Sequence, residues 1–142
     1  MPLLFDGIKE NNFLIIGRAG MDLYPDPPGA ATEDAISMSV GLGGSSANIA
    51  AGICKLGGKS ALVTRVSDDS IGLYCVNQLK KYGVDVSYVK PVGGEFRNSL
   101  AVYESRVEKH QSVIYRNGAA DFQMDTDDVR VINYSKYGAL IT

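Results

Sequence analysis

Hydrophobic residues form two patterns along the chain, and the first consists of short continuous runs. Such runs occupy Phe13–Gly17, Ser60–Val66 and Val84–Val89, and they are typical of strands buried on both faces. Between them, Ile49–Leu56 and Ile71–Leu79 have the spacing of helices, and glycines follow both. This strand–helix–strand–helix–strand order predicts an α/β fold with a parallel sheet and crossover helices.

The second pattern is the alternation of apolar and polar residues, which is typical of strands with one exposed face. It occupies Ile36–Val40, Ser99–Glu104 and Gln111–Arg116, and the last two runs predict an antiparallel hairpin across a charged turn. The prolines and the glycine of Pro25–Glu33 predict a loop that leaves the main body. These segments therefore lie outside the strand–helix alternation.

The last part of the chain predicts one more helix and one more strand. Asp125 starts a helix that continues to about Tyr134, with acidic residues favourably placed at its positive end. Tyr137–Thr142 then begins an apolar strand. Because no helix follows to cover this strand, we expect the domain to continue in a longer chain.

Composition narrows the class of protein. The chain has 142 residues and is 45% hydrophobic, which suits one compact domain with a core. A net charge of -2 argues against a dedicated nucleic-acid or anionic-membrane binder, and no apolar run reaches transmembrane length. Cys54 and Cys75 are expected to be reduced core residues, and His110 stands alone, so no metal site is expected. Because Met1–Asn12 carries no secretion signal, we expect a cytoplasmic protein.

The glycine-rich stretch Gly41–Asn48 is the first candidate site. It runs directly into the first predicted helix, and its glycines allow the backbone to approach a ligand closely. Ser45 and Ser46 are good caps for the free N–H groups of that helix, so the turn could hold a polar or anionic small molecule. The stretch is neither a P-loop nor a dinucleotide-binding motif, which would need glycine in place of Ser46.

A second candidate site follows the first buried strand. Arg18, Gly20, Asp22 and Tyr24 come directly after it, at the strand end where open α/β sheets bind ligands. Asp22 could accept hydrogen bonds from substrate hydroxyls, or it could cap a turn.

These motifs resemble a known family. Gly41–Gly58 and Thr64–Gly72 resemble the N-terminal signature of ribokinase-like (PfkB) carbohydrate kinases, and Gly17–Tyr24, Asn98–Val102 and Tyr115–Asp121 add to the resemblance. It implies an αβα sandwich with a parallel sheet and a small β-sheet lid, formed by residues 25–42 and 95–117. Residues 1–142 would then be the N-terminal part of one sugar kinase domain.

The resemblance also implies the roles of five residues. Asp22 would bind sugar hydroxyls, and Arg116 would bind the carboxylate of an acid sugar. The other implied sugar-binding residues are Gly43, Gly44 and Asn48. Two alternatives stay open, because Asn48 could cap the helix and Arg116 could be a solvated charge at a strand end. Gly20 stands where the family commonly has asparagine.

The catalytic half is expected beyond Thr142. In the family, a Gly-Ala-Gly-Asp motif supplies the general base, and the ATP pocket also lies late in the chain. Gly118–Asp121 is similar to that motif, but it lacks the second glycine and follows the hairpin, so Asp121 is not expected to be the base. ATP and Mg²⁺ are therefore expected only in a longer enzyme, and this chain alone is expected to be inactive.

The substrate implied by the motifs is 5-dehydro-2-deoxygluconate. Kinases of 2-keto-3-deoxygluconate, fructose or ribose share the same frame, and a non-catalytic sugar-binding module is a further alternative. A homodimer through the lid is expected, because an exposed half-apolar sheet attracts a partner.

Overall fold

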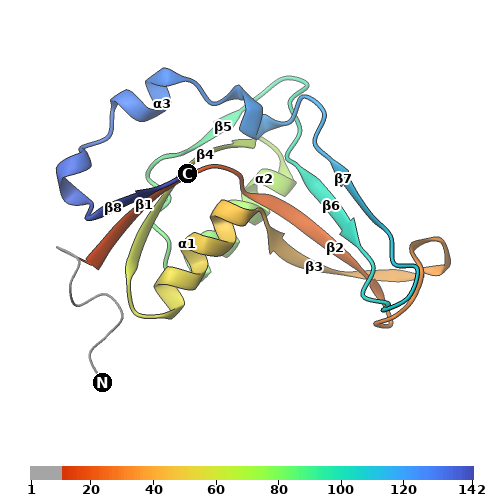
Figure 1. Cartoon of the computed structure of the whole chain (residues 1–142). Coiled ribbons are helices and arrows are strands. Elements are labelled where there is room, and N and C mark those ends of the chain that lie inside the picture. Colours follow the sequence, from red (N-terminus) through yellow and green to blue (C-terminus); the bar gives the residue numbers. More distant parts are fainter. Residues whose placement is uncertain (1–10) are drawn as a thin grey trace.

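The computed structural model describes residues 11–142, which contain two four-stranded sheets (Figure 1). The first, called the body sheet, has the order β5–β4–β1–β8, and its neighbouring strands are parallel. The parallel α/β body expected from the apolar runs is confirmed. Its strands are β1 (Asn12–Ile16), β4 (Lys59–Ser67), β5 (Val89–Val92) and β8 (Ala139–Ile141).

Two helices cover one face of the body sheet. They are α1 (Ser45–Lys55) and α2 (Ser70–Lys81), and the side chain of Asp69 caps α2 by accepting hydrogen bonds from the backbone of Ile71 and Gly72. Apolar side chains of both helices meet alternate residues of β1 and β4, which is the arrangement that buries one face of a sheet. The buried cluster between them includes Phe13, Ile15, Ala50, Ile53, Leu62, Val66, Cys75 and Leu79.

The C-terminal segment covers the opposite face of the body sheet. It contains two short 3-10 helices and α3 (Thr126–Arg130), and Figure 1 shows it crossing the sheet in blue. Ile132 is 6% exposed and belongs to the cluster of Leu14, Ala61 and Val63 on this side. The fold is therefore a three-layer sandwich whose third layer is a single crossing segment. The 3-10 helices are η3 (Ala120–Gln123) and η4 (Tyr134–Lys136).

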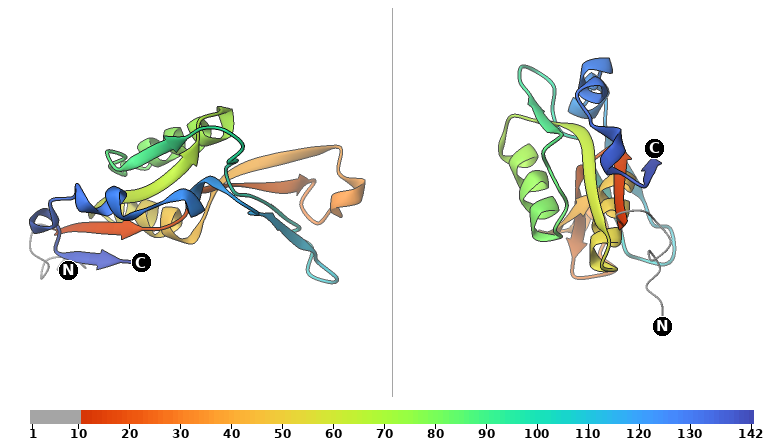
Figure 2. Two further views of the ribbon diagram at one scale, coloured as in Figure 1. Left: turned by 90° about the horizontal axis from the view of Figure 1, so that it is seen from above. Right: turned by 90° about the vertical axis from the view of Figure 1, so that its left-hand side faces the viewer.

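The second sheet, called the lid, has the order β3–β2–β6–β7. Strand β2 pairs antiparallel with β3 and parallel with β6, and β6 forms the expected antiparallel hairpin with β7. Figure 2 shows the lid extending away from the body as an arm. Its strands are β2 (Gly20–Asp26), β3 (Ser37–Gly43), β6 (Leu100–Tyr103) and β7 (Ser112–Tyr115).

A buried carboxylate joins the two loops at the far end of the lid. Glu104 Oε1 accepts a hydrogen bond from the backbone N–H of Thr32 (2.8 Å), in the 3-10 helix η2 (Thr32–Asp34) between β2 and β3. Its Oε2 accepts from Arg106 Nε (2.6 Å) and from the backbone N–H of Gln111 (2.7 Å). The bond from Thr32, with those from Gln111 and Arg106, lowers the pKa of Glu104 to about 2.

One predicted loop is partly a strand. Gly20–Asp26 forms β2, so the loop expected from Pro25 onward begins only after Asp26. The alternation of apolar and polar residues from Met21 to Asp26 indicates a strand, but the prolines of this region favoured the prediction of a loop. Pro25 is tolerated because β6 pairs with β2 only up to Leu23, so no ladder bond to β6 needs its missing N–H group.

Two predicted boundaries are wrong. Val84–Val89 is not a strand, because Asp85 Oδ1 accepts a hydrogen bond from Ser87 N (2.9 Å) and turns the chain before β5. The helix expected from Asp125 to about Tyr134 ends at Arg130. Asn133 then starts a separate turn, because its side chain accepts a hydrogen bond from Ser135 N (3.2 Å).

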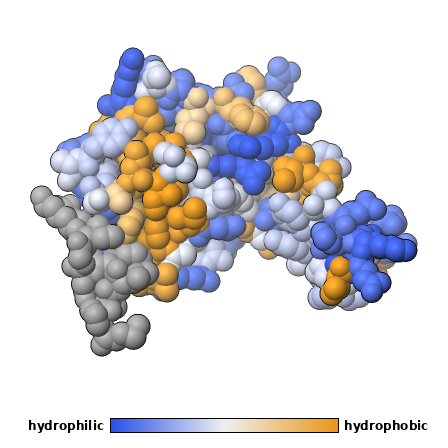
Figure 3. Space-filling view, viewed as in Figure 1, coloured by the Kyte–Doolittle hydropathy of each residue, from blue (hydrophilic) through white to orange (hydrophobic). Residues whose placement is uncertain are grey.

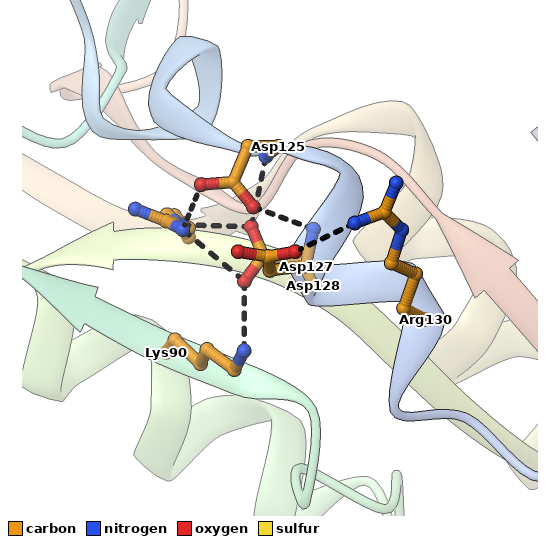
Figure 4. Close-up of polar contacts among 6 residues, drawn as sticks. Lys90, Asp125, Asp127, Asp128 and Arg130 are labelled. Carbon is orange, nitrogen blue, oxygen red and sulfur yellow. Dashed lines mark hydrogen bonds and ion pairs between the residues drawn. The ribbon is translucent and has the colours of Figure 1, made fainter.

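An ion cluster fastens the C-terminal segment to the body sheet (Figure 4). Asp128 of α3 is 2% exposed and pairs with Arg65 Nε on β4 (2.8 Å) and Lys90 Nζ on β5 (2.9 Å). It also accepts a hydrogen bond from the backbone N–H of Asp125 (3.0 Å). Burial alone would raise the pKa of Asp128, but these partners outweigh burial and lower it to about 2.

Replacing Asp128 by Asn should lower the free energy of unfolding by about 3 kcal/mol near neutral pH, because Arg65 and Lys90 lose their buried partner. Urea unfolding followed by circular dichroism measures the change. Because the pKa of Asp128 is lower in the folded than in the unfolded state, its contribution is complete above roughly pH 4 and is lost as the pH falls through about 2. The difference between the two proteins should therefore shrink over that range.

Asp127→Asn is the matched control for this prediction. Asp127 pairs with Arg130 at 3.4 Å on the surface, where its side chain is 78% exposed. Its loss should change the free energy of unfolding by less than about 0.5 kcal/mol. Equal destabilisation by the two substitutions would show that the buried cluster does not fasten the segment.

Candidate functional site

Asp22 lies on one face of the lid among small residues. In the sheet register it pairs with Gly41 on β3 and Ala101 on β6, and the next pair toward the body is Gly20 with Gly43. Because side chains alternate across a strand, these residues share the face of Asp22, called the Asp22 face. None of these four residues has a side chain larger than a methyl group, so the bulky side chain that reaches the carboxylate on this face is Tyr24, from β2 itself.

Asp22 has one hydrogen-bond partner among the described residues. The hydroxyl of Tyr24 donates to its Oδ2 (3.4 Å), and the Tyr24 ring stacks with Tyr103 on the same face. Burial raises the pKa of Asp22, while the Tyr24 bond and the charge of Arg18 act in the opposite direction. A partly desolvated carboxylate with one long hydrogen bond can accept further bonds from ligand hydroxyls. The alternative of a turn-capping aspartate is excluded, because Asp22 lies within β2.

The glycine-rich turn stands directly beside Asp22. A Cβ atom on Gly43 would collide with the Asp22 carboxylate, and one on Gly44 would collide with the backbone oxygen of Arg18. Gly44 also has a φ of 96°, which disfavours any other residue. The same Arg18 oxygen accepts a hydrogen bond from Ala47 N (3.2 Å). Because Gly44 has no Cβ atom, the start of α1 can pack against the connection between β1 and β2. Because Gly43 has none, the Asp22 carboxylate has room beside it.

The expected caps of α1 are wrong. Gly44 is the capping residue, and neither Ser45, Ser46 nor Asn48 provides a side-chain cap. The free N–H group of Ala47 in the first turn donates instead to the backbone oxygen of Arg18. This bond takes the place of a serine side-chain cap.

Asn48 lies in the first turn of α1. It is exposed and lines a cavity of about 200 Å³ with Leu42, Lys55 and Tyr82. Leu42 pairs with Met21, so it belongs to the opposite face of the lid, called the apolar face. A contact of Asn48 with sugar therefore stays a prediction.

Arg116 is held by its own neighbours. Its Nε and Nη2 atoms donate to Asp121 Oδ2, and its guanidinium lies over the ring of Phe122, 4.3 Å from the centroid. The Asp121 side chain is buried, and the Arg116 side chain is partly exposed. Arg116 is therefore not the freely solvated strand-end charge of the alternative interpretation, and Asp121 is engaged in an ion pair.

Asn98 is a structural residue whose role the sequence did not reveal. Its Nδ2 donates to the backbone oxygen of Ala19 (3.2 Å) and to Cys75 Sγ (3.3 Å), and its Oδ1 accepts from Ser67 N (3.2 Å). It thereby joins the lid strand β6 to the ends of β1 and β4 and to α2. Its place in the motif Asn98–Val102 was the only available signal.

A larger cavity lies elsewhere in the described part of the chain. It measures about 650 Å³ and lies between α2 and β5, where Val66, Leu73, Val76 and Pro91 supply mainly apolar walls. It contains none of the predicted site residues. The Asp22 face is the better candidate because it combines a desolvated carboxylate with bare backbone.

Residues 10–140 of the chain match the pfkB family carbohydrate kinases. The chain belongs to this family. Two relatives named 5-dehydro-2-deoxygluconokinase come from Clostridium perfringens (37% identity over 131 residues) and Geobacillus thermodenitrificans (33% over 128). The matches cover 88% and 89% of this chain but only 37% and 38% of those proteins. The chain thus spans well under half the length of these relatives.

Solved structures of sugar kinases share the fold. A sugar kinase from Pyrococcus horikoshii, determined in complex with ATP, aligns with a TM-score of 0.75 at 25% identity, covering 87% of this chain and 39% of that one. A fructokinase from Xylella fastidiosa aligns with a TM-score of 0.79 at 20% identity, covering 93% and 40%. The ribokinase-like fold expected from the motifs is confirmed.

Residues 11–142 offer neither a metal-binding cluster nor a membrane-spanning helix. No group of three or more His, Cys, Asp or Glu side chains there is placed to hold a metal ion. Within the same range no helix is long and apolar enough to cross a bilayer. Cys54 and Cys75 are free thiols, and Cys75 is buried.

Replacing Gly44 by Ala should destabilise the fold by at least about 2 kcal/mol, because the added Cβ meets the Arg18 oxygen and the φ of 96° is strained. Gly52→Ala is the control. Gly52 lies inside α1 with open space around it, so alanine should stabilise the helix by up to about 1 kcal/mol. Urea unfolding of both variants gives the comparison. If Gly44→Ala were as stable as Gly52→Ala, the close approach at the turn would be refuted.

Proposed function

We propose that this chain is the sugar-binding part of an ATP-dependent carbohydrate kinase, a phosphotransferase to an alcohol group. The observation that supports this most directly is the Asp22 carboxylate, which lies partly desolvated among small residues and against the bare Gly43–Gly44 backbone. Such an arrangement suits a polyol, whose hydroxyls donate to the carboxylate while its ring or chain lies over the small residues. Membership of the pfkB family supports phosphoryl transfer as the reaction.

The five predicted residues take distinct roles in this proposal. Asp22 accepts hydrogen bonds from sugar hydroxyls, and Gly43 keeps the space beside it free of side-chain atoms. Gly44 lets α1 start close to the sugar, and Asn48 adds a polar contact. Arg116 contributes to recognition of a carboxylate.

The proposed substrate is 5-dehydro-2-deoxygluconate, phosphorylated at its 6-hydroxyl. Several relatives at 30–37% identity carry the corresponding kinase name, and an acid sugar would use the arginine at the exit of β7. 2-Keto-3-deoxygluconate, fructose and ribose are the alternatives that the assay below distinguishes.

ATP and Mg²⁺ are proposed as the phosphoryl donor and its metal ion, held by residues that this chain does not supply. Asp121, which resembles the family base by its local sequence, is bonded to Arg116 and is not assigned as the base. This chain alone should therefore bind sugar without transferring phosphate. A cytoplasmic location remains part of the proposal.

Asp22→Ala should weaken binding of 5-dehydro-2-deoxygluconate to the 142-residue chain at least about tenfold, because hydrogen bonds to a charged group contribute about 1.5–3 kcal/mol. Gly43→Ala should have a similar effect, since its Cβ displaces the carboxylate without removing the charge. Isothermal titration calorimetry measures both affinities. Asp34→Ala, at an exposed position of the lid tip, is the control and should leave the affinity unchanged.

The reaction itself requires an assay of a longer protein that contains this chain. ADP release should be fastest with 5-dehydro-2-deoxygluconate and should fall when Asp22 is replaced by Ala. Faster turnover of another sugar would reassign the substrate. No turnover with any sugar, acidic or neutral, would contradict the kinase proposal.

A homodimer through the apolar face of the lid is also proposed. Val40, Val113 and Tyr115 share this face and are 51%, 44% and 63% exposed. Covering these exposed apolar side chains with a second copy of the lid would stabilise the pair by removing apolar surface from water.

Val40→Lys should convert the dimer to a monomer, because it places a charge in the proposed interface. Ser39→Lys is the matched control, since the adjacent residue points to the opposite face of β3. Sedimentation equilibrium of the wild type and both variants gives the result. A wild-type monomer, or a dimer that survives Val40→Lys, would contradict the interface.

A further inference from the structure

Arg116 already has a carboxylate partner, so its charge is not available in full to a substrate. Two of its nitrogen atoms, Nε and Nη2, donate to the same oxygen of Asp121. The Asp121 side chain is 4% exposed and that of Arg116 is 40% exposed, so water screens this pair only in part. Recognition of a substrate carboxylate therefore needs a second source of positive charge.

A second guanidinium lies at the same cavity. Arg97 and Arg116 both line a cavity of about 210 Å³, whose other walls include Asn98, Tyr115 and Asn117. The backbone oxygen of Arg97 accepts a hydrogen bond from Ala120 N (2.8 Å), which fixes the two segments side by side. The cavity is thus built from the entrance to β6 and the exit from β7.

Arg97 carries an uncompensated charge in the described part of the chain. Its Nη1 donates to the neutral backbone oxygen of Gly94 (2.8 Å), and no ion pair to Arg97 occurs among residues 11–142. Burial would raise the pKa of Asp69, but hydrogen bonds from Ser67 and the α2 backbone, together with the charge of Arg97, lower it. Asp69 is thus near Arg97 without pairing with it, because its Oδ1 caps α2.

We infer that Arg97 is a specificity-determining residue, and that the Arg97–Arg116 cavity is the subsite for the carboxylate of a sugar acid. The inference rests on the proposed sugar-binding function. Two positive charges and the negative charge of Asp121 leave one positive charge, which complements one carboxylate better than a doubly charged phosphate.

The place of the cavity on the lid agrees with this assignment. Ile114 shares the Asp22 face through its pairing with Ala101, and Arg116 follows two residues later, directly after the end of β7. Strand β7 lies two strands from β2, a separation of about 10 Å. A six-carbon sugar acid and the two side chains can span that separation, with hydroxyls at Asp22 and the carboxylate at the arginines.

The test uses probes that separate the anion from the polyol. The 142-residue chain is labelled with ¹⁵N and titrated with gluconate, with glucitol, which lacks the carboxylate, and with acetate. Gluconate and acetate should shift the Nε–Hε signals of Arg97 and Arg116, and glucitol should not. Arg97→Met should weaken gluconate binding at least about tenfold and glucitol binding less than about twofold. Arg130→Met, on the exposed side of α3, is the control and should change neither.

Each outcome decides a different point. If gluconate binds but Arg97→Met leaves its affinity unchanged, the role of Arg97 is refuted and sugar binding stands. If acetate shifts both arginine signals while neither polyol shifts the amides of Asp22 and Gly43, the anion subsite stands and the proposed sugar binding fails. Inorganic phosphate binding more tightly than acetate would overturn the carboxylate assignment.

Discussion

The close approach of two backbone segments at the base of the lid is the constraint on which the structure depends. Gly44 lies against the connection Gly17–Ala19, and a Cβ atom on Gly44 would push the two segments apart, while one on Gly43 would meet the Asp22 carboxylate. Asn98, just before β6, also bonds to this connection, because its Nδ2 donates to the Ala19 oxygen. The position of Asp22 relative to α1 is fixed by backbone contacts, which are less adjustable than contacts between long side chains.

The buried and partly buried carboxylates of the protein differ in the number and strength of their ion-pair and hydrogen-bond partners. Asp128, Glu104 and Asp121 are buried, and each has an arginine partner. Asp22 is also partly buried, but its hydrogen bond comes from the Tyr24 hydroxyl at 3.4 Å. A desolvated charge that the protein leaves without an ion pair is the kind of group that a ligand can complete, since leaving such a group unpaired has a cost in stability.

The sequence predicted the elements with strong periodicity and missed those decided by tertiary contacts. The buried strands β1 and β4 and the hairpin of β6 and β7 follow directly from their apolar patterns. Strand β2 was missed because Pro25 and its neighbours outweighed the alternation, and the tolerance of Pro25 depends on where β6 stops pairing. The nearness of Asp22 to Gly43 was expected from the motifs, and the structure shows it. Neither the Asp121 partner of Arg116 nor the nearness of Arg97 could be predicted, because both depend on how the chain turns after β7.

The carboxylate at the far end of the lid limits how the lid can move. Glu104 accepts hydrogen bonds from both the β2–β3 loop and the β6–β7 loop, so it holds the tips of the two hairpins together. With a pKa of about 2, Glu104 stays ionised and bonded through the acidities that cells experience. The four strands of the lid are therefore joined at the tip as well as along the sheet, and any tilt of the lid carries all of them together.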